Sequence, residues 1–61
     1  MTKSEAKELA KIKLFHNMGH HDTAARSLSY LIRATRTSAN RAEMMKTAEA
    51  LKLTANPDFI V

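Results

Sequence analysis

The sequence predicts an all-α fold, a small domain of three helices. Three stretches carry apolar side chains at helical spacing, and helix start and stop signals separate them. The 61 residues include only one glycine and one proline. We place the helical domain at residues 1–55 and a C-terminal tail at residues 56–61. A chain of this length buries only about 60% of its unfolded surface. It has no cysteine to form a disulfide, so the remaining supports are oligomerisation, a bound metal or very well packed helices. Of these we expect an obligate dimer, for a reason that the first helix gives.

The first helix is expected over residues 3–18. Thr2 and Glu5 have the spacing of a capping box at its start. Gly19 supplies the left-handed residue that commonly ends a helix. The apolar residues of this helix fall on two separate stripes. They are Leu9, Ile12 and Phe15 on one stripe and Ala10, Leu14 and Met18 on the other. We expect the second stripe to contact a second copy of the chain or another protein.

The second helix is expected over residues 23–36, with Asp22 as its N-cap. The third is expected over residues 41–53, with Asn40 as its cap and Pro57 preventing its continuation. If the two formed one helix, the apolar stripe that contains Met44 would point nearly opposite to that of Leu28. A break near residues 38–40 lets both stripes face one core. A long bent helix over residues 23–53 remains the alternative.

The expected arrangement is an antiparallel hairpin of the first two helices, with the third helix across it. Each helix contributes one apolar face to a shared core. The predicted core residues are Leu9, Ile12, Phe15, Leu28, Leu31, Ile32, Met44, Ala48 and Leu51. The tail is expected to fold back on the helices, and a free C-terminal peptide that a partner captures is the alternative.

The net charge is +4 and is unevenly distributed. Residues 1–21 and residues 22–37 each carry an excess of +2, and residues 38–61 are neutral. A basic half of this kind can attract nucleic acid, an anionic membrane or an acidic protein, although it also serves solubility alone. The N-terminus lacks the apolar run of a signal peptide, and no segment approaches the length of a membrane span. We therefore expect a cytoplasmic protein without a membrane partner.

Four side chains near the glycine could ligate a metal: His16, His20, His21 and Asp22. Zinc takes about four tetrahedral ligands, and one short loop can rarely aim that many at one point. Asp22 also has a competing role as a cap. We assign no metal, cofactor or catalytic residue, and leave open a metal shared between two copies. A three-helix chain of this length can hardly enclose a substrate pocket, and its single glycine excludes the usual phosphate-binding loops. We therefore expect a protein that is not an enzyme.

The outer face of the second helix is the main candidate site. Arg26, Tyr30 and Arg33 share one stripe, with Arg36 to one side. Arginine binds phosphate through paired hydrogen bonds, and a tyrosine ring can stack on a base. We therefore predict a regulatory or accessory protein that binds DNA or RNA. Residues 47–56 resemble the opening of a helix-turn-helix, but too few residues follow for a recognition helix.

The alternative is an adaptor or inhibitor of the kind that phages and plasmids encode, which docks on another protein. Its contacts would come from apolar side chains on the helices and from the tail. The candidate residues are Leu14, Met18, Met45, Phe59, Ile60 and Val61.

Overall fold

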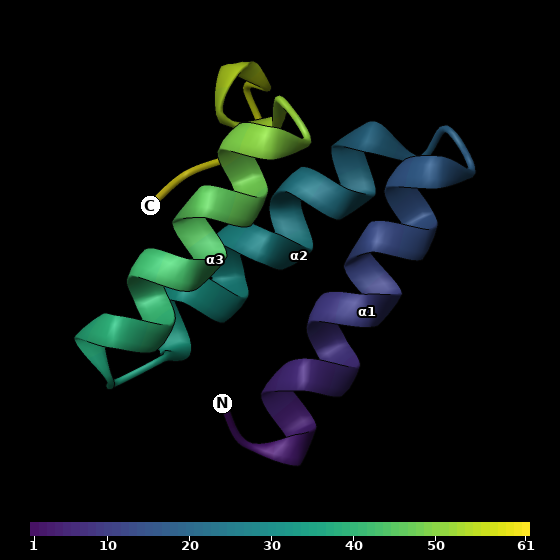
Figure 1. The fold of residues 1–61 in the computed structure, drawn as a ribbon. Helices are drawn as coiled ribbons and strands as arrows, with labels where there is room; N and C mark the ends of the chain where they lie inside the picture. The colour runs from purple at the N-terminus through teal and green to yellow at the C-terminus, as the bar shows by residue number, and fades with distance from the viewer.

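The computed structural model describes all of residues 1–61 and confirms the all-α prediction (Figure 1). It contains the helices α1 (Lys3–Asn17), α2 (His21–Ala34) and α3 (Ser38–Ala50), followed by the short 3-10 helix η1 (Leu53–Ala55). α1 and α2 form an antiparallel hairpin, as expected. α3 does not lie across this hairpin. It packs mainly against α2, which therefore occupies the middle of the fold.

The start of α1 is the predicted capping box. The Thr2 backbone N–H donates to Glu5 Oε1 at 2.8 Å, and the Glu5 backbone N–H donates to Thr2 Oγ1 at 3.1 Å. These two bonds satisfy donors that the first turn of a helix cannot pair internally. The bond from the Thr2 backbone is also the main cause that holds the pKa of the Glu5 carboxyl below its ordinary value.

The corner between α1 and α2 is a Schellman turn centred on Gly19, which has a φ of 89°. The Gly19 N–H donates to the His16 carbonyl at 3.0 Å, and the His20 N–H donates to the Phe15 carbonyl at 2.9 Å. The His20 ring also meets the Phe15 ring edge to face, with centroids 6.3 Å apart. Gly19 therefore ends α1 as predicted.

α2 begins earlier than expected, and the assignment of Asp22 as its N-cap is wrong. The N-cap is His20, and its side chain makes no capping bond. The Schellman turn has already reversed the chain there, so the helix starts immediately after it. Asp22 lies in the first turn, where a carboxylate suits the positive end of the helix dipole. Its Oδ1 accepts a hydrogen bond from Asn56 Nδ2 at 2.9 Å.

The helix break falls at residues 35–37, so α2 and α3 are separate helices. Thr35 and Thr37 both have extended backbone angles. The buried Thr35 hydroxyl donates to the Leu31 carbonyl at 2.7 Å, and Arg41 Nε donates to the Ile32 carbonyl at 3.3 Å. These side chains satisfy the last turn of α2, which explains why it ends at Ala34 and not at residue 36.

The predicted cap of α3 is also wrong. α3 starts at Ser38 after Thr37, and Asn40 lies inside the helix. The helix ends at Ala50 and not at residue 53, because Lys52 takes a left-handed backbone with a φ of 59°. This turn brings Leu53 back into the core, where only 1% of its surface remains exposed.

One hydrophobic core joins the three helices and η1. Six of the nine predicted core residues are buried. Phe15, Leu31 and Leu51 are only partly buried and pack against this core. Sequence reasoning missed Leu53, because its position depends on the left-handed turn before it. The buried apolar residues are Leu9, Ile12, Ala24, Ala25, Leu28, Ile32, Met44, Ala48 and Leu53.

The C-terminal segment folds back on the helices, as expected. Phe59 is partly buried against the core. Asn56 bonds to Asp22, and Asp58 forms an ion pair with Arg26. These contacts attach the segment to the first half of α2.

None of the helices combines the length and the apolarity that crossing a bilayer requires.

Candidate functional site

The outer face of α2 carries three of the four predicted nucleic-acid residues. Arg26, Tyr30 and Arg33 follow one another at intervals of four and three residues, and all three are exposed. This spacing places them on one side of the helix. Arg36 is also exposed, but it lies in the connection between α2 and α3, beyond the end of the helix. We call Arg26, Tyr30 and Arg33 the α2 face.

Tyr30 is the most prominent residue of the α2 face, with 70% of its surface exposed. The Arg33 guanidinium lies 5.8 Å from the centre of its ring, within the range of a cation–π contact. A groove of about 450 Å³ runs beside Tyr30, lined by Leu31, Ala34 and the α1 residue Glu8 among others. A second hollow of about 310 Å³ is lined by Tyr30, Arg33 and Ala34. The tyrosine thus borders two open hollows.

The positive charge of the α2 face is partly compensated within the chain. Arg26 Nη2 lies 3.2 Å from Asp58 Oδ2, and about two thirds of the arginine side chain remains exposed. Glu8 lines the same groove and pairs with Lys11 at 3.9 Å. Sequence reasoning did not include Asp58 or Glu8 in the site. Asp58 is 32 residues from Arg26, and no periodic signal links the two positions.

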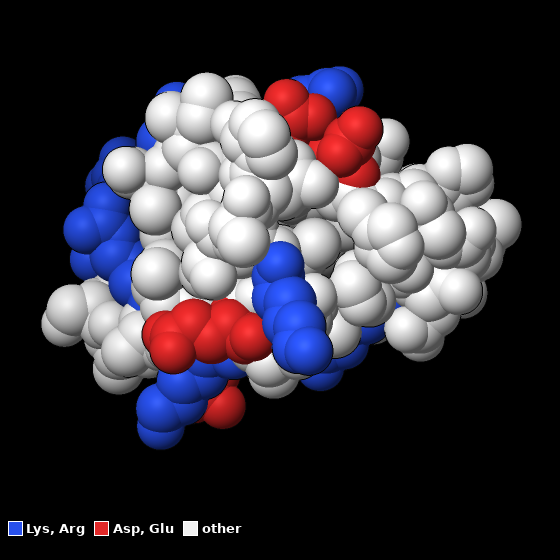
Figure 2. Space-filling view, turned by 90° about the horizontal axis from the view of Figure 1, so that it is seen from above, with Lys and Arg blue, Asp and Glu red and all other residues white.

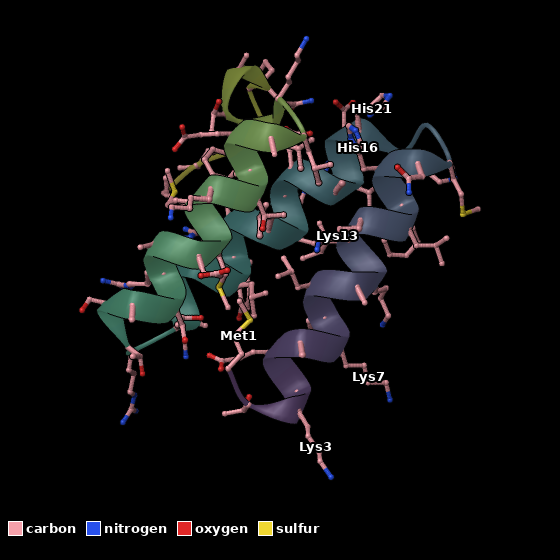
Figure 3. All side chains as sticks on the ribbon, in the orientation of Figure 1. Met1, Lys3, Lys7, Lys13, His16 and His21 are labelled. Carbon is pink, nitrogen blue, oxygen red and sulfur yellow. The ribbon has the colours of Figure 1, made fainter.

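The charged residues form no single basic patch at the end of the molecule that carries the α1–α2 corner and the C-terminal segment. Figure 2 looks onto this end and shows Lys and Arg in separate groups, with acidic residues and a wide uncharged area between them. On α1, Lys3 and Lys7 project away from the other helices in Figure 3. Basic side chains are therefore dispersed at this end and along α1, and the α2 face is distinguished by its exposed ring.

The predicted protein-docking residues fall into two groups. Leu14 and Met18 are 57% and 60% exposed and lie four residues apart, Leu14 in α1 and Met18 at its C-cap. Ile60 and Val61 are 64% and 59% exposed at the end of the chain. The remaining two residues are partly buried and pack against the core: Met45 and Phe59.

The four residues proposed as metal ligands do not converge. No group of three or more histidine, cysteine or acidic side chains is placed to hold an ion. The structure does bring two of the four together: His16 Nδ1 and His21 Nδ1 are 3.0 Å apart (Figure 3). The His20 ring instead contacts Phe15, and the Asp22 carboxylate binds Asn56.

Comparison with known proteins identifies no relative: no family model, curated protein or solved structure matches this chain. The functional interpretation therefore depends on the geometry of the chain itself.

Proposed function

We propose that this protein acts by binding nucleic acid through the α2 face, without enzymatic activity and as a homodimer. The observation that carries the proposal is the exposed ring of Tyr30 between two arginines and beside an open groove. A single exposed tyrosine is ordinary by itself, and the support comes from its place between Arg26 and Arg33 and beside the groove.

The arrangement suits a single strand better than a duplex. A base can stack on Tyr30 while the groove accepts the edge of its ring, and arginine side chains can bind the flanking phosphates. Stacking tolerates any base because every base has a π-face. We therefore expect weak sequence preference.

Fluorescence anisotropy with short labelled single strands and a duplex tests this proposal. Arg33→Gln should weaken binding to a single strand. It should also make the negative slope of log affinity against log salt concentration shallower by about 0.7 for each bound copy. Lys46→Gln removes the same charge from an exposed position on α3 and is the matched control. If no oligonucleotide binds even at low salt, the proposal is wrong.

The ring itself has a separate test. Tyr30→Ala should weaken single-strand binding by about 1–3 kcal/mol, which is roughly 5- to 150-fold. Tyr30→Phe keeps the stacking surface and should bind nearly as well as the native chain. Equal losses in the two variants would show that the hydroxyl matters and the stacking does not.

Substitution of Asp58 should increase the affinity for nucleic acid. Its carboxylate competes with phosphate for Arg26, because the two side chains are 3.2 Å apart. Asp58→Asn should therefore strengthen nucleic-acid binding at low salt. A weaker complex would indicate that Arg26 needs this partner in order to be positioned.

The homodimer part of the proposal is supported by the exposed pair Leu14 and Met18 on α1. Light scattering at two concentrations should show a dimer, and Leu14→Glu should convert it to a monomer. A native chain that stays monomeric at high concentration would contradict the dimer.

The same exposed residues favour a second candidate function, docking on another protein. Ile60 and Val61 add to the apolar surface. A pull-down that resists nuclease and is lost in Met18→Asp, or on deletion of residues 60–61, would support this function. That deletion retains Phe59, which contacts the core.

A further inference from the structure

The corner between α1 and α2 contains a histidine pair that the proposed function does not use. His16 lies in the last turn of α1, and His21 is the first residue of α2. In one continuous helix, residues five apart would point about 140° away from each other. The turn at Gly19 reverses the chain and brings the two rings to a centroid separation of 4.6 Å.

We propose that His16 and His21 bind one divalent transition-metal ion through their Nδ1 atoms. Imidazole nitrogen is a good ligand for zinc, copper and nickel. The two nitrogens come from different helices and lie 3.0 Å apart. The site is independent of the α2 face, because it lies at the hairpin corner and shares no residue with that face.

The spacing of the nitrogens favours a particular geometry. Imidazole nitrogens bind such ions at about 2.0–2.1 Å. Two nitrogens that are 3.0 Å apart would then subtend about 94° at a shared ion. This angle matches adjacent positions in square-planar or octahedral coordination and is well below the tetrahedral angle of about 109°. Ni²⁺ and Cu²⁺, which take such positions, are therefore the first ions to test at this pair.

The surroundings leave room for the other ligands of the ion. His16 and His21 line an open hollow of about 450 Å³, together with Asn56 and Lys52 among others. Water, or a group from a second molecule, can fill the remaining coordination positions. Lys52 opposes a bound cation, and so does Lys13, which precedes His16 by three residues on α1 (Figure 3).

Both Nδ1 atoms must offer a lone pair to the ion. Without metal, a hydrogen bond between the two Nδ1 atoms requires one of them to carry hydrogen. When the ion binds, that ring takes the tautomer with hydrogen on Nε2, so a neutral pair releases no net proton. Protons compete with the ion for the imidazole nitrogens, so binding should weaken as the solution is acidified. The charged groups around the pair are Lys13, Lys52 and Asp22, and the Asp22 carboxylate is already bonded to Asn56.

Isothermal titration of the full chain with NiCl₂ tests the proposal. The native chain should bind Ni²⁺. His16→Ala and His21→Ala should each lower the Ni²⁺ affinity by more than about tenfold, because loss of a residue that only supports a metal ligand already costs about 10–100-fold. His20→Ala removes the neighbouring exposed histidine that is outside the pair and should keep the native affinity. Its stability is measured separately, because its ring contacts Phe15.

A measurement on the native chain avoids any effect of substitution on folding. In NMR spectra, paramagnetic Ni²⁺ should broaden the ring signals of His16 and His21 before those of His20. Ni²⁺ should also raise the melting temperature, because it binds a pair that only the folded state arranges. No detectable binding at millimolar Ni²⁺, equal broadening of all three histidines, or native affinity in either pair variant would overturn the proposal.

Discussion

Gly19 gives the sharpest test of how this chain forms its hairpin. Its φ of 89° lies in the left-handed region, which L-residues with a Cβ rarely adopt. A Cβ built at Gly19 meets no atom within 4 Å beyond its two neighbours in the chain. Gly19→Ala would therefore introduce backbone strain without a steric clash. Any loss of stability in this variant therefore measures the cost of placing an L-residue at the positive φ of the turn.

The expected magnitude follows from two opposing effects. A left-handed backbone costs an L-residue about 1–2 kcal/mol. Replacing glycine by alanine also restricts the unfolded chain, which returns about 0.4–1 kcal/mol. Gly19→Ala should therefore destabilise the fold by about 1 kcal/mol, or lower the melting temperature by roughly 4–8 °C. A chain of this length has a total stability of about 3–9 kcal/mol, so the variant should still fold.

The matched control is D-alanine at the same position, introduced by chemical synthesis. A D-residue favours positive φ, so this variant keeps the entropic gain without the strain and should be about 0.4–1 kcal/mol more stable than the native chain. Thermal and urea unfolding followed by circular dichroism would compare the three chains. If the L- and D-alanine variants melt at the same temperature, the assigned role of the Gly19 turn is wrong.

Three further predictions concern the core and the helix ends. Leu28→Ala should cost about 3–5 kcal/mol, because Leu28 is fully buried. Unfolding in urea should show that this variant is close to losing its folded structure. Lys46→Ala, at an exposed position on α3, should change stability by less than about 0.5 kcal/mol. Lys52→Gly should stabilise the fold by up to about 1 kcal/mol, because glycine adopts the left-handed φ of 59° at the end of α3 without strain. An unchanged melting temperature would contradict this prediction. The lowered pKa of Glu5 stabilises the fold above the unfolded pKa of the carboxyl, and this contribution is lost as the pH falls through the folded value. The difference in stability between the native chain and Glu5→Gln should therefore shrink between pH 7 and pH 3, and a constant difference would show that the Glu5 charge plays no part.

The helix boundaries show why capping signals predict some ends and miss others. The Thr2–Glu5 box and the Gly19 turn depend only on neighbouring residues, so their sequence patterns identified them. Asp22 and Asn40 have suitable side chains for caps but do not act as caps. Asp22 instead bonds to Asn56, which is 34 residues away. Local propensity cannot predict a partner at that distance.

The candidate sites divide in the same way. Helical periodicity placed Arg26, Tyr30 and Arg33 on one exposed face, because a helix fixes the direction of residues three and four apart. The pairing of Arg26 with Asp58 depends on the path of the C-terminal segment, which no local pattern predicts. The histidine corner was recognised in the sequence, but the convergence of only two of its four candidate ligands was not.

The three helices, the capping box, the Gly19 corner and most of the core could be predicted from the sequence, because they depend on contacts within a few residues and on one regular period. Three features could not be predicted in this way: the central place of α2, the turn at Lys52 that buries Leu53, and the 3.0 Å separation of His16 Nδ1 and His21 Nδ1. Each of these features depends on how separate helices meet, and the angle and register of that contact are set by packing of the whole chain.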